Sequence, residues 1–216
     1  MNKEKARFNM VEQQIRPWQV SDPAILNLMA TLPREFFVPE AYRSMAFADL
    51  AIPLPHKQQM FVPREEARLL QSLELTANDT ILEVGTGTGF LTALLASLGK
   101  KVFSLDLFPE FITEAEKKLK QMSITNVELE AADAAQGWPH HAPYDVIVVT
   151  ASIEMPPKTF LKQLANGGRL FTIEGEQDSM VACRYLKTND KVSKSYLFET
   201  HSPRLRNAEK PKAFVF

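Results

Sequence analysis

The sequence is poor in cysteine, with Cys183 as the single one among 216 residues. One cysteine cannot form an internal disulfide, which favours a reducing compartment. Because Cys183 lies in an expected strand, we interpret it as a buried thiol rather than a nucleophile. Long apolar runs are lacking too: none approaches the roughly 18 residues of a membrane span. No apolar segment of a secretory signal follows the charged residues 1–5. We therefore expect a cytoplasmic protein with no membrane partner.

Neither sign of charge dominates, since the formal net charge is −1. The segment 184–212 is nevertheless basic, with eight lysines and arginines against three acids. Such a segment suits phosphate contacts, and the alternative is a solvated hairpin whose lysines protect a sheet edge. No interleaving of basic and aromatic residues suggests base stacking. We favour the solvated hairpin and expect no nucleic-acid partner.

Glycine is scarce as well, but three of the eight glycines lie within five positions, at Gly85, Gly87 and Gly89. The apolar residues before them indicate a buried strand, and those after them a helix. A glycine turn between strand and helix lets backbone N–H groups approach a ligand where no Cβ intrudes. A dinucleotide fingerprint needs G-x-G-x-x-G, whose last glycine would fall here at Phe90 or Thr92. The E-x-G-x-G-x-G present instead resembles motif I of S-adenosylmethionine-dependent methyltransferases, so a nicotinamide cofactor is the weaker alternative.

Proline marks the division of the chain. Helices are expected over 3–15, stopped by Arg16-Pro17, and over 23–31, after an N-cap at Asp22. Five prolines then fall between Pro33 and Pro63, which indicates an irregular segment covering a site. We therefore predict a helical, proline-rich N-terminal extension over 1–63 and a methyltransferase domain over 64–216.

Strands and helices alternate through the second part. The expected strands are 80–84, 101–105, 126–130, 144–149 and 169–173, and the expected helices are 64–73, 90–98, 109–121 and 157–164. A turn is expected at Gly167-Gly168, a hairpin over 180–188 and 192–200, and a further strand over 213–216. This alternation predicts an α/β fold: a doubly wound, mainly parallel, seven-stranded sheet with right-handed crossovers and an antiparallel C-terminal hairpin.

Three acids fall at the ends of expected strands. A carboxylate at Asp106, after the second strand, can accept hydrogen bonds from both hydroxyls of a ribose. Asp133, after the third strand, is placed to meet the exocyclic amine of an adenine. Glu83 precedes the glycine turn, where it either orders the turn or meets the amino group of the ligand. Each acid alone is equally well read as a helix cap or a loop end, but all three together favour an adenosine-containing ligand.

Four motifs extend over most of the chain. Residues 33–39 read P-R-E-F-F-V-P and residues 82–89 read L-E-V-G-T-G-T-G. Residues 137–139 and 144–151 read G-W-P and Y-D-V-I-V-V-T-A, and Q-L at 163–164 precedes G-G-R-L at 167–170. In these motifs the chain resembles the protein-L-isoaspartate O-methyltransferase family, which implies a Rossmann-like methyltransferase fold and S-adenosylmethionine as cofactor. The resemblance also implies protein repair, by esterification of isoaspartyl carboxylates in a damaged protein or peptide.

The resemblance implies two groups of site residues. Those expected to hold the cofactor are Glu83, Gly85, Thr86, Gly87, Gly89, Asp106, Leu107, Asp133 and Ala134. Those expected on the acceptor side, as catalytic residues, are His56, Gln58 and Thr150, with Ala151 beside them. His56 either holds a carboxylate or acts as a base for a hydroxyl substrate, and the structural alternative is a loop histidine bonded to the backbone. No metal is expected, because His140-His141 has no ligand set around it.

The acceptor loop departs from the family. Where the family has G-H-G-Q-T-I-S-Q-P, residues 55–63 read P-H-K-Q-Q-M-F-V-P. His56, Gln58 and Pro63 match, but Gln59, Phe61 and Val62 replace a threonine, a serine and a glutamine. Phenylalanine and valine offer no side-chain hydrogen bonds, and a site that loses such bonds can reject a polar substrate.

The methyl transfer itself survives this change. A carboxylate with a pKa near 4 is already ionised at neutral pH, so no strong base is required. Catalysis would rest on positioning and on dispersing the charge of the sulfonium. Three hypotheses follow: an isoaspartyl methyltransferase, a methyltransferase of the same fold for another acceptor such as a small carboxylate, and a non-catalytic cofactor-binding module. In each case we expect a monomer or a weak dimer.

Overall fold

The chain begins with helices that pack against the main body. The computed structural model describes residues 2–155, 157–176, 179–189 and 191–208. Helix α1 (Lys3–Asn9) is capped by Asn2, whose Oδ1 accepts hydrogen bonds from the backbone of Glu4 and Lys5. It continues as a π-helical turn, η1 (Met10–Ile15), and a short 3-10 helix, η2 (Arg16–Trp18). The helical path thus runs past the expected stop, because Pro17 lies in the first turn of η2, where its missing N–H is not needed.

The proline-rich segment is more regular than the sequence predicts. Helix α2 (Pro23–Thr31) begins, as expected, at the cap Asp22. Two short helices follow, α3 (Arg34–Phe37) and η3 (Glu40–Met45). Strands β1 (Ile52–Leu54) and β2 (Gln58–Met60) then pair antiparallel, joined by the 3-10 turn η4 (Pro55–Lys57). This small two-stranded sheet was not foreseen, because such short strands carry no periodic pattern.

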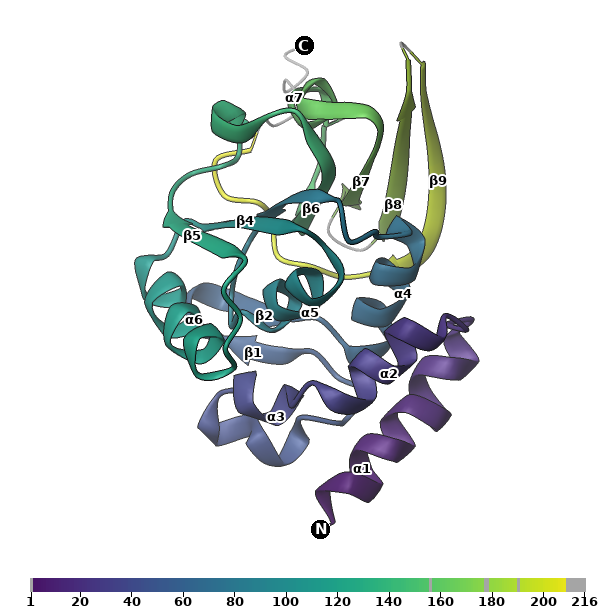
Figure 1. The fold of residues 1–216 in the computed structure, drawn as a ribbon, viewed down its shortest axis with the longest axis vertical. Coiled ribbons are helices and arrows are strands. Elements are labelled where there is room, and N and C mark those ends of the chain that lie inside the picture. Colours follow the sequence, from purple (N-terminus) through teal and green to yellow (C-terminus); the bar gives the residue numbers. More distant parts are fainter. Residues whose placement is uncertain (1, 156, 177–178, 190, 209–216) are drawn as a thin grey trace, which may run out of the picture.

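The main sheet has seven strands in the order β5-β4-β3-β6-β7-β8-β9. Their bounds are β3 (Thr80–Val84), β4 (Lys101–Asp106), β5 (Val127–Ala131), β6 (Tyr144–Ile153), β7 (Leu164–Glu176), β8 (Ser179–Thr188) and β9 (Lys191–Thr200). The first five are parallel, and β7, β8 and β9 pair antiparallel. The expected fold class is confirmed, with the β8–β9 hairpin extending from the body (Figure 1). The strand expected over 213–216 lies outside the described residues.

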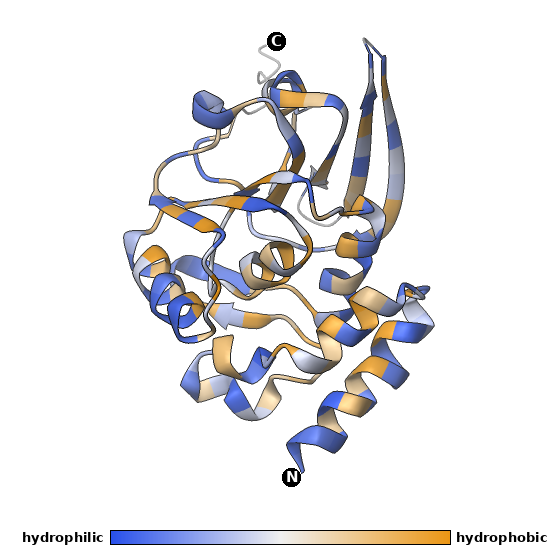
Figure 2. Cartoon of the chain, in the orientation of Figure 1, coloured by the Kyte–Doolittle hydropathy of each residue, from blue (hydrophilic) through white to orange (hydrophobic). Residues whose placement is uncertain are grey.

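Helix α4 (Pro63–Leu73) leads into β3, and three helices connect parallel strands: α5 (Phe90–Leu98), α6 (Pro109–Gln121) and α7 (Lys158–Gln163). A 3-10 turn, η5 (Pro139–His141), precedes β6. Helix α5 is hydrophobic around most of its surface, whereas α6 alternates hydrophobic and hydrophilic residues, as in a helix with one solvent face (Figure 2). The pairing of β6 with β7 is irregular between Tyr144 and Val146. This irregularity accommodates the residues around Gly167, where a turn was expected.

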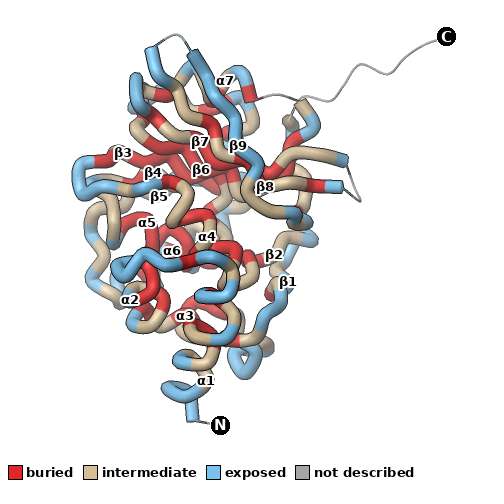
Figure 3. The backbone as a smooth tube through the Cα atoms, turned by 90° about the vertical axis from the view of Figure 1, so that its right-hand side faces the viewer, coloured by how far each residue is buried: buried red, intermediate tan, exposed pale blue. Residues whose placement is uncertain are grey.

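Both faces of the main sheet are covered. Ile81, Val146 and Phe171 pack with α4, α5 and the N-terminal helices. The alternate residues of the same strands, such as Leu82 and Ile147, pack with Phe160 of α7. Because successive side chains of a strand point to opposite faces, these two clusters make the sheet doubly wound and bury its central strands (Figure 3). Residues 191–196 of the edge strand β9 are exposed.

The strand order determines where a ligand can bind. The chain moves outward from β3 to β4 and β5, then returns to the other side of β3 to form β6. Ligands of open α/β sheets bind beyond the carboxyl ends of the strands, at such a reversal. The reversal here lies between β3, which ends in the glycine turn, and β6, which carries Thr150.

Candidate functional site

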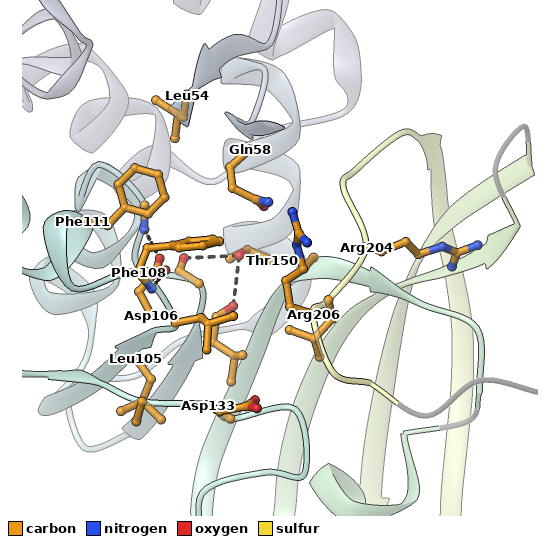
Figure 4. Close-up of a pocket in the computed structure, with 18 of the residues that line it drawn as sticks. Leu54, Gln58, Leu105, Asp106, Phe108, Phe111, Asp133, Thr150, Arg204 and Arg206 are labelled. Atoms are coloured by element: carbon orange, nitrogen blue, oxygen red, sulfur yellow. Dashed lines mark hydrogen bonds between the residues drawn. The ribbon is translucent and has the colours of Figure 1, made fainter. Parts of the chain in front are cut away.

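A pocket opens at the carboxyl ends of β3, β4, β5 and β6 (Figure 4). Its walls come from six parts of the chain, which are the β1–β2 sheet, the glycine turn, the segment after β4, the loop after β5, the end of β6 and the segment after β9. Nine of the expected site residues line it: Gln58, Gly85, Gly87, Asp106, Leu107, Asp133, Ala134, Thr150 and Ala151. The other four, His56, Glu83, Thr86 and Gly89, do not line this pocket.

The glycine turn is held close to its neighbours. The backbone N–H groups of Gly85 and Thr86 both donate to the carbonyl of Leu105, at 2.8 and 3.2 Å. Gly85 has a φ of 103°, and a Cβ at that position would lie 2.1 Å from Oγ1 of Thr150. Glycine is therefore required at residue 85 for two reasons, the backbone conformation and the close approach of β6. Thr86 lies beneath the turn, where its Oγ1 is 2.7 Å from Oγ of Ser104.

Asp106 joins the end of β4 to the glycine turn. Its Oδ2 accepts a hydrogen bond of 2.9 Å from the backbone of Gly87, and its Oδ1 one of 3.0 Å from that of Phe108. Burial raises the pKa of the Asp106 carboxyl, while these two N–H groups oppose the rise. A carboxylate offers about four lone-pair sites. Asp106 can therefore still accept hydrogen bonds from a pair of ligand hydroxyls.

Glu83 lies below the pocket. Its Oε2 accepts hydrogen bonds from Oγ1 of Thr92 at 2.5 Å and from Oγ of Ser104 at 2.6 Å. Burial raises the pKa of its carboxyl to about 8, against the effect of these two hydroxyls. Of the two roles expected for Glu83, this arrangement fits the ordering of the turn, because the carboxyl joins β3 to α5 and β4.

The loop after β5 supplies a second carboxylate to the pocket. Asp133 is exposed, and its Oδ1 accepts a hydrogen bond of 3.0 Å from the backbone of Ala135. Its Oδ2 accepts a hydrogen bond of 2.7 Å from Nδ2 of Asn207. Ala134 is buried beside it, and Leu107, in the wall formed by the segment after β4, is 38% exposed. Phe108 and Phe111 add aromatic surface to that wall.

The three residues expected on the acceptor side have different surroundings. The Thr150 hydroxyl donates to the carbonyls of Val84 and Gly85, at 3.0 and 3.2 Å. Nε2 of Gln58 donates to the carbonyl of His56 at 3.1 Å. The His56 ring stacks on Phe108 with its centroid 3.9 Å away, and its Nε2 contacts the carboxylate of Glu110. His56 therefore supports the wall of the pocket from behind.

Phe61 belongs largely to the core. It is 9% exposed and packs edge-on against Phe171, with ring centroids 6.5 Å apart. Its remaining surface faces a smaller cavity on the other side of the glycine turn, which shares Gly85, Gly87 and Thr150 with the main pocket. Val62 precedes α4, and its carbonyl accepts the N–H groups of the first turn of that helix. Of the two replacements, Phe61 thus packs into the hydrophobic core and Val62 caps the start of α4.

A buried ion pair fixes the acceptor loop from below. Arg34, in the motif P-R-E-F-F-V-P, contacts the carboxylate of Glu66 on α4, and both side chains are buried. Arg34 also donates to the carbonyls of Ala46 at 3.0 Å and Phe61 at 2.6 Å. Burial raises the pKa of Glu66, while the charge of Arg34 opposes that rise. The motif therefore positions Phe61 without touching the main pocket.

The segment after β9 contributes pocket residues that the sequence did not reveal. The backbone of Leu205 donates to the carbonyl of Ser152 at 2.9 Å, and Ser152 donates to that of Pro203 at 2.8 Å. These bonds hold the segment along the end of β6, so that Arg204, Leu205 and Arg206 line the pocket. The basic segment is thus not only a solvated hairpin. The motifs contain no signal for this return, since it depends on contacts of Ser152 with residues 51 and 53 positions further along the chain.

The part of the chain that the structure describes contains neither a metal centre nor a helix that could span a membrane. No group of three or more His, Cys, Asp or Glu residues there is arranged to hold a metal ion. None of the helices described is both long and apolar enough to cross a membrane.

Known proteins resemble this chain along most of its length. The model of the family described as protein-L-isoaspartate(D-aspartate) O-methyltransferase matches residues 5–201. The protein-L-isoaspartate O-methyltransferase of Gloeobacter violaceus is 39% identical over 168 residues, which are 78% of this chain and 82% of that protein. The enzyme of the same name from Trichlorobacter lovleyi is 36% identical over 190 residues, 88% of each chain.

Solved structures agree with this match. A structure named protein-L-isoaspartate O-methyltransferase has a TM-score of 0.78 and 25% identity, covering 94% of this chain and 65% of its own. A Plasmodium falciparum protein in complex with S-adenosyl-L-homocysteine also has a TM-score of 0.78, and it covers 92% of this chain and 97% of its own. Its identity is 19%, so this second likeness shows the fold alone.

Proposed function

Because the chain belongs to the protein-L-isoaspartate(D-aspartate) O-methyltransferase family, we propose that it transfers the methyl group of S-adenosylmethionine to the carboxylate of an isoaspartyl residue in a protein or peptide. The observation that carries the proposal is the joining of Asp106 to the glycine turn, in one pocket with Thr150. In our proposal the pocket thus holds both the carboxylate that we assign to the ribose and a residue that we assign to the acceptor side.

The residues of the pocket fit S-adenosylmethionine. The free lone pairs of Asp106 suit the two ribose hydroxyls, and the aromatic wall of Phe108 and Phe111 suits an adenine. Gly87 has a φ of 52° and lines the pocket, so its backbone can lie against the ligand without a side chain between them. In our proposal Gly85, Leu107, Asp133 and Ala134 complete the contacts, while Glu83, Thr86 and Gly89 hold the turn in place. When bound, S-adenosylmethionine supplies an electrophilic methyl group on a sulfonium.

The acceptor side needs positioning more than acid–base chemistry. An ionised carboxylate attacks without losing a proton, so neither His56 nor Thr150 has to act as a base. The Thr150 hydroxyl uses its proton on the carbonyls of Val84 and Gly85, so its oxygen can only accept a further hydrogen bond. We therefore assign Thr150 to orienting the glycine turn. We assign Gln58 to the acceptor contact. His56 positions Phe108, and residues 1–63 cover the site through Leu54, Gln58 and Gln59.

One observation favours a second candidate acceptor. Phe61 and Val62 stand where the family has a serine and a glutamine, and Phe61 packs into the core. At these two positions the loop therefore lacks polar side chains that would hold a peptide substrate. A small carboxylate that enters the pocket alone would need fewer such contacts, with the same fold and cofactor.

A methylation assay separates these possibilities. The purified protein is given S-adenosylmethionine labelled in its methyl group, together with an isoaspartyl peptide or the same peptide with a normal aspartyl residue. Label on the isoaspartyl peptide alone supports the proposal. Cofactor binding by calorimetry without that label rejects the isoaspartyl acceptor, and a screen of small acids then tests the second candidate. Failure to bind S-adenosylmethionine rejects both.

Two further parts of the proposal concern the cellular location and the oligomeric state of the protein. We propose a cytoplasmic location, which the single buried Cys183 supports, because a reducing compartment leaves such a thiol unpaired. We also propose a monomer or a weak dimer. Size-exclusion chromatography with light scattering over a range of concentrations tests the second statement, and a stable higher oligomer would contradict it.

A further inference from the structure

Two arginines from the segment after β9 line the pocket, and they point in different directions. Arg204 is directed away from it (Figure 4), where it donates to the carbonyl of Gly175 at 2.6 Å and pairs with Glu154 at 3.0 Å. The guanidinium of Arg206 points into the pocket, toward Gln58 and Thr150 (Figure 4). Among the described residues, the structure records no ion pair or hydrogen bond of the Arg206 side chain. Arg206 thus brings a positive charge to the acceptor side.

The backbone on either side of Arg206 is anchored. Leu205 donates to the carbonyl of Ser152 at 2.9 Å, and Asn207 reaches across to Oδ2 of Asp133 at 2.7 Å. Asn207 adopts the left-handed conformation, with a φ of 60°. These contacts fix the point from which the Arg206 side chain extends, although the side chain itself is exposed.

The carboxylates already in the pocket have other partners. Asp106 accepts from the backbone of Gly87 and Phe108, and Asp133 accepts from Ala135 and Asn207. A guanidinium presents five N–H donors in a planar fork that matches a carboxylate. An anionic ligand that enters on the side of Gln58 would therefore find the charge of Arg206 available to it.

We propose that Arg206 binds the carboxylate that is methylated and so selects an anionic acceptor. This inference rests on the proposed function. It also gives the acceptor side an ionic contact, where Phe61 and Val62 supply no polar side chain. Arg206 donates to one carboxylate oxygen, while the other forms the new O–CH₃ bond. The S–CH₃ bond breaks, its electron pair stays on sulfur, and no proton moves. Because the ester has no charge, Arg206 holds the product less tightly than the substrate.

The test compares two peptides that differ in this charge alone. One carries an isoaspartyl residue, and in the other its α-carboxylate is replaced by a carboxamide. Calorimetry in the presence of saturating S-adenosylhomocysteine gives the Kd of each peptide, and a separate titration gives the Kd of S-adenosylhomocysteine. The variants are Arg206→Gln and Arg206→Lys. Arg184→Gln is the matched control, since it removes a cation of the same basic segment that does not line the pocket.

We expect Arg206→Gln to weaken binding of the isoaspartyl peptide about 10-fold, with the Kd of the carboxamide peptide and of S-adenosylhomocysteine unchanged. The Kd of the isoaspartyl peptide for Arg206→Lys should lie between those for the parent protein and Arg206→Gln. The Kd for Arg184→Gln should equal that for the parent protein. Raising the ionic strength should weaken the binding of the isoaspartyl peptide to the parent protein, and it should have a smaller effect on the binding to Arg206→Gln. The unchanged affinity for S-adenosylhomocysteine also shows that the variant is folded.

Two results would overturn the inference alone. In the first, Arg206→Gln keeps the parent's preference for the acid peptide, so the charge acts elsewhere. In the second, the affinity for S-adenosylhomocysteine falls by the same factor as that for the peptide, so Arg206 holds the cofactor. A parent protein that binds S-adenosylhomocysteine but neither binds nor methylates the isoaspartyl peptide would instead reject the proposed function, and the inference with it.

Discussion

The backbone N–H of Gly87 donates a hydrogen bond of 2.9 Å to Oδ2 of Asp106. Through this bond one carboxylate both shapes the glycine turn and faces the pocket. Gly87 and Asp106 are 19 residues apart in the chain, yet the hydrogen bond between them fixes the position of both. Loss of the carboxylate should therefore affect the cofactor site twice, through a missing acceptor and through a loosened turn.

Asp106→Ala should raise the Kd of S-adenosylhomocysteine about 10- to 100-fold, which corresponds to losing charge-assisted hydrogen bonds. Isothermal calorimetry measures the change. Asp145→Asn is the matched control, because Oδ2 of Asp145 accepts a backbone hydrogen bond of 2.8 Å from Thr80 at the start of β3. An unchanged Kd in Asp106→Ala would refute the role of Asp106 in the cofactor site.

Glu83→Gln should flatten the dependence of stability on pH. The folded protein retains the Glu83 proton up to a pKa of about 8, whereas the unfolded chain releases it near 4.5. The free energy of unfolding therefore falls as the pH rises between these two values. Glu66 acts in the same direction but is present in both proteins, so the difference between the two curves isolates Glu83. Urea unfolding at several pH values from 5 to 8 tests this, and parallel curves would contradict it.

Gly85→Ala should destabilise the protein by about 2 kcal/mol more than Gly167→Ala. Both glycines have a positive φ, which costs a side chain about 1 kcal/mol or more. A Cβ at residue 167 meets nothing within 4 Å, whereas one at residue 85 would lie 2.1 Å from Oγ1 of Thr150. Thr150 would then have to give up its bonds to Val84 and Gly85, which adds to the cost. Chemical denaturation of the two variants measures the difference, and equal losses would show that the close approach is relieved without cost.

Arg34→Met and Glu66→Leu should each destabilise the protein by about 3 kcal/mol, because Glu66→Leu leaves the buried charge of Arg34 without its partner and Arg34→Met leaves the buried Glu66 carboxyl without its hydrogen-bond donor. The double variant should lose clearly less than the sum of the two, by about 2 kcal/mol or more. Denaturation of the parent, both single variants and the double variant completes the thermodynamic cycle. Additive losses would mean that the two charges are stabilised independently.

The cofactor side of the pocket was predictable because it depends on local order along the chain. A strand that runs into Gly85, Gly87 and Gly89, and an acid directly after the next strand, are both visible as sequence patterns. Their meeting follows from the parallel alternation. For Glu83 the sequence predicts the position in the chain but not the direction of the side chain. Its place at a strand end was correctly identified, but side chains alternate along a strand, and its carboxyl packs beneath the turn against Thr92.

The acceptor side was less predictable because it depends on contacts between distant segments. The position of His56 behind Phe108 follows from its contact with Glu110, 54 residues away. Arg206 reaches the pocket because the chain returns along β6 after two antiparallel strands. Neither arrangement has a periodic pattern, and a count of basic residues in 184–212 cannot separate Arg206 from the cations of the hairpin.

The return of the chain along β6 also bears on how the protein is made. Leu54 and Arg206 line the same pocket, so residues separated by most of the polypeptide must be present before the pocket exists. The strands β3 to β6 can pair while later residues are still being synthesised, whereas contacts of such long range form slowly. The nascent chain would therefore complete the wall that contains Arg206 last, after the strands that carry the glycine turn and Asp106 have paired.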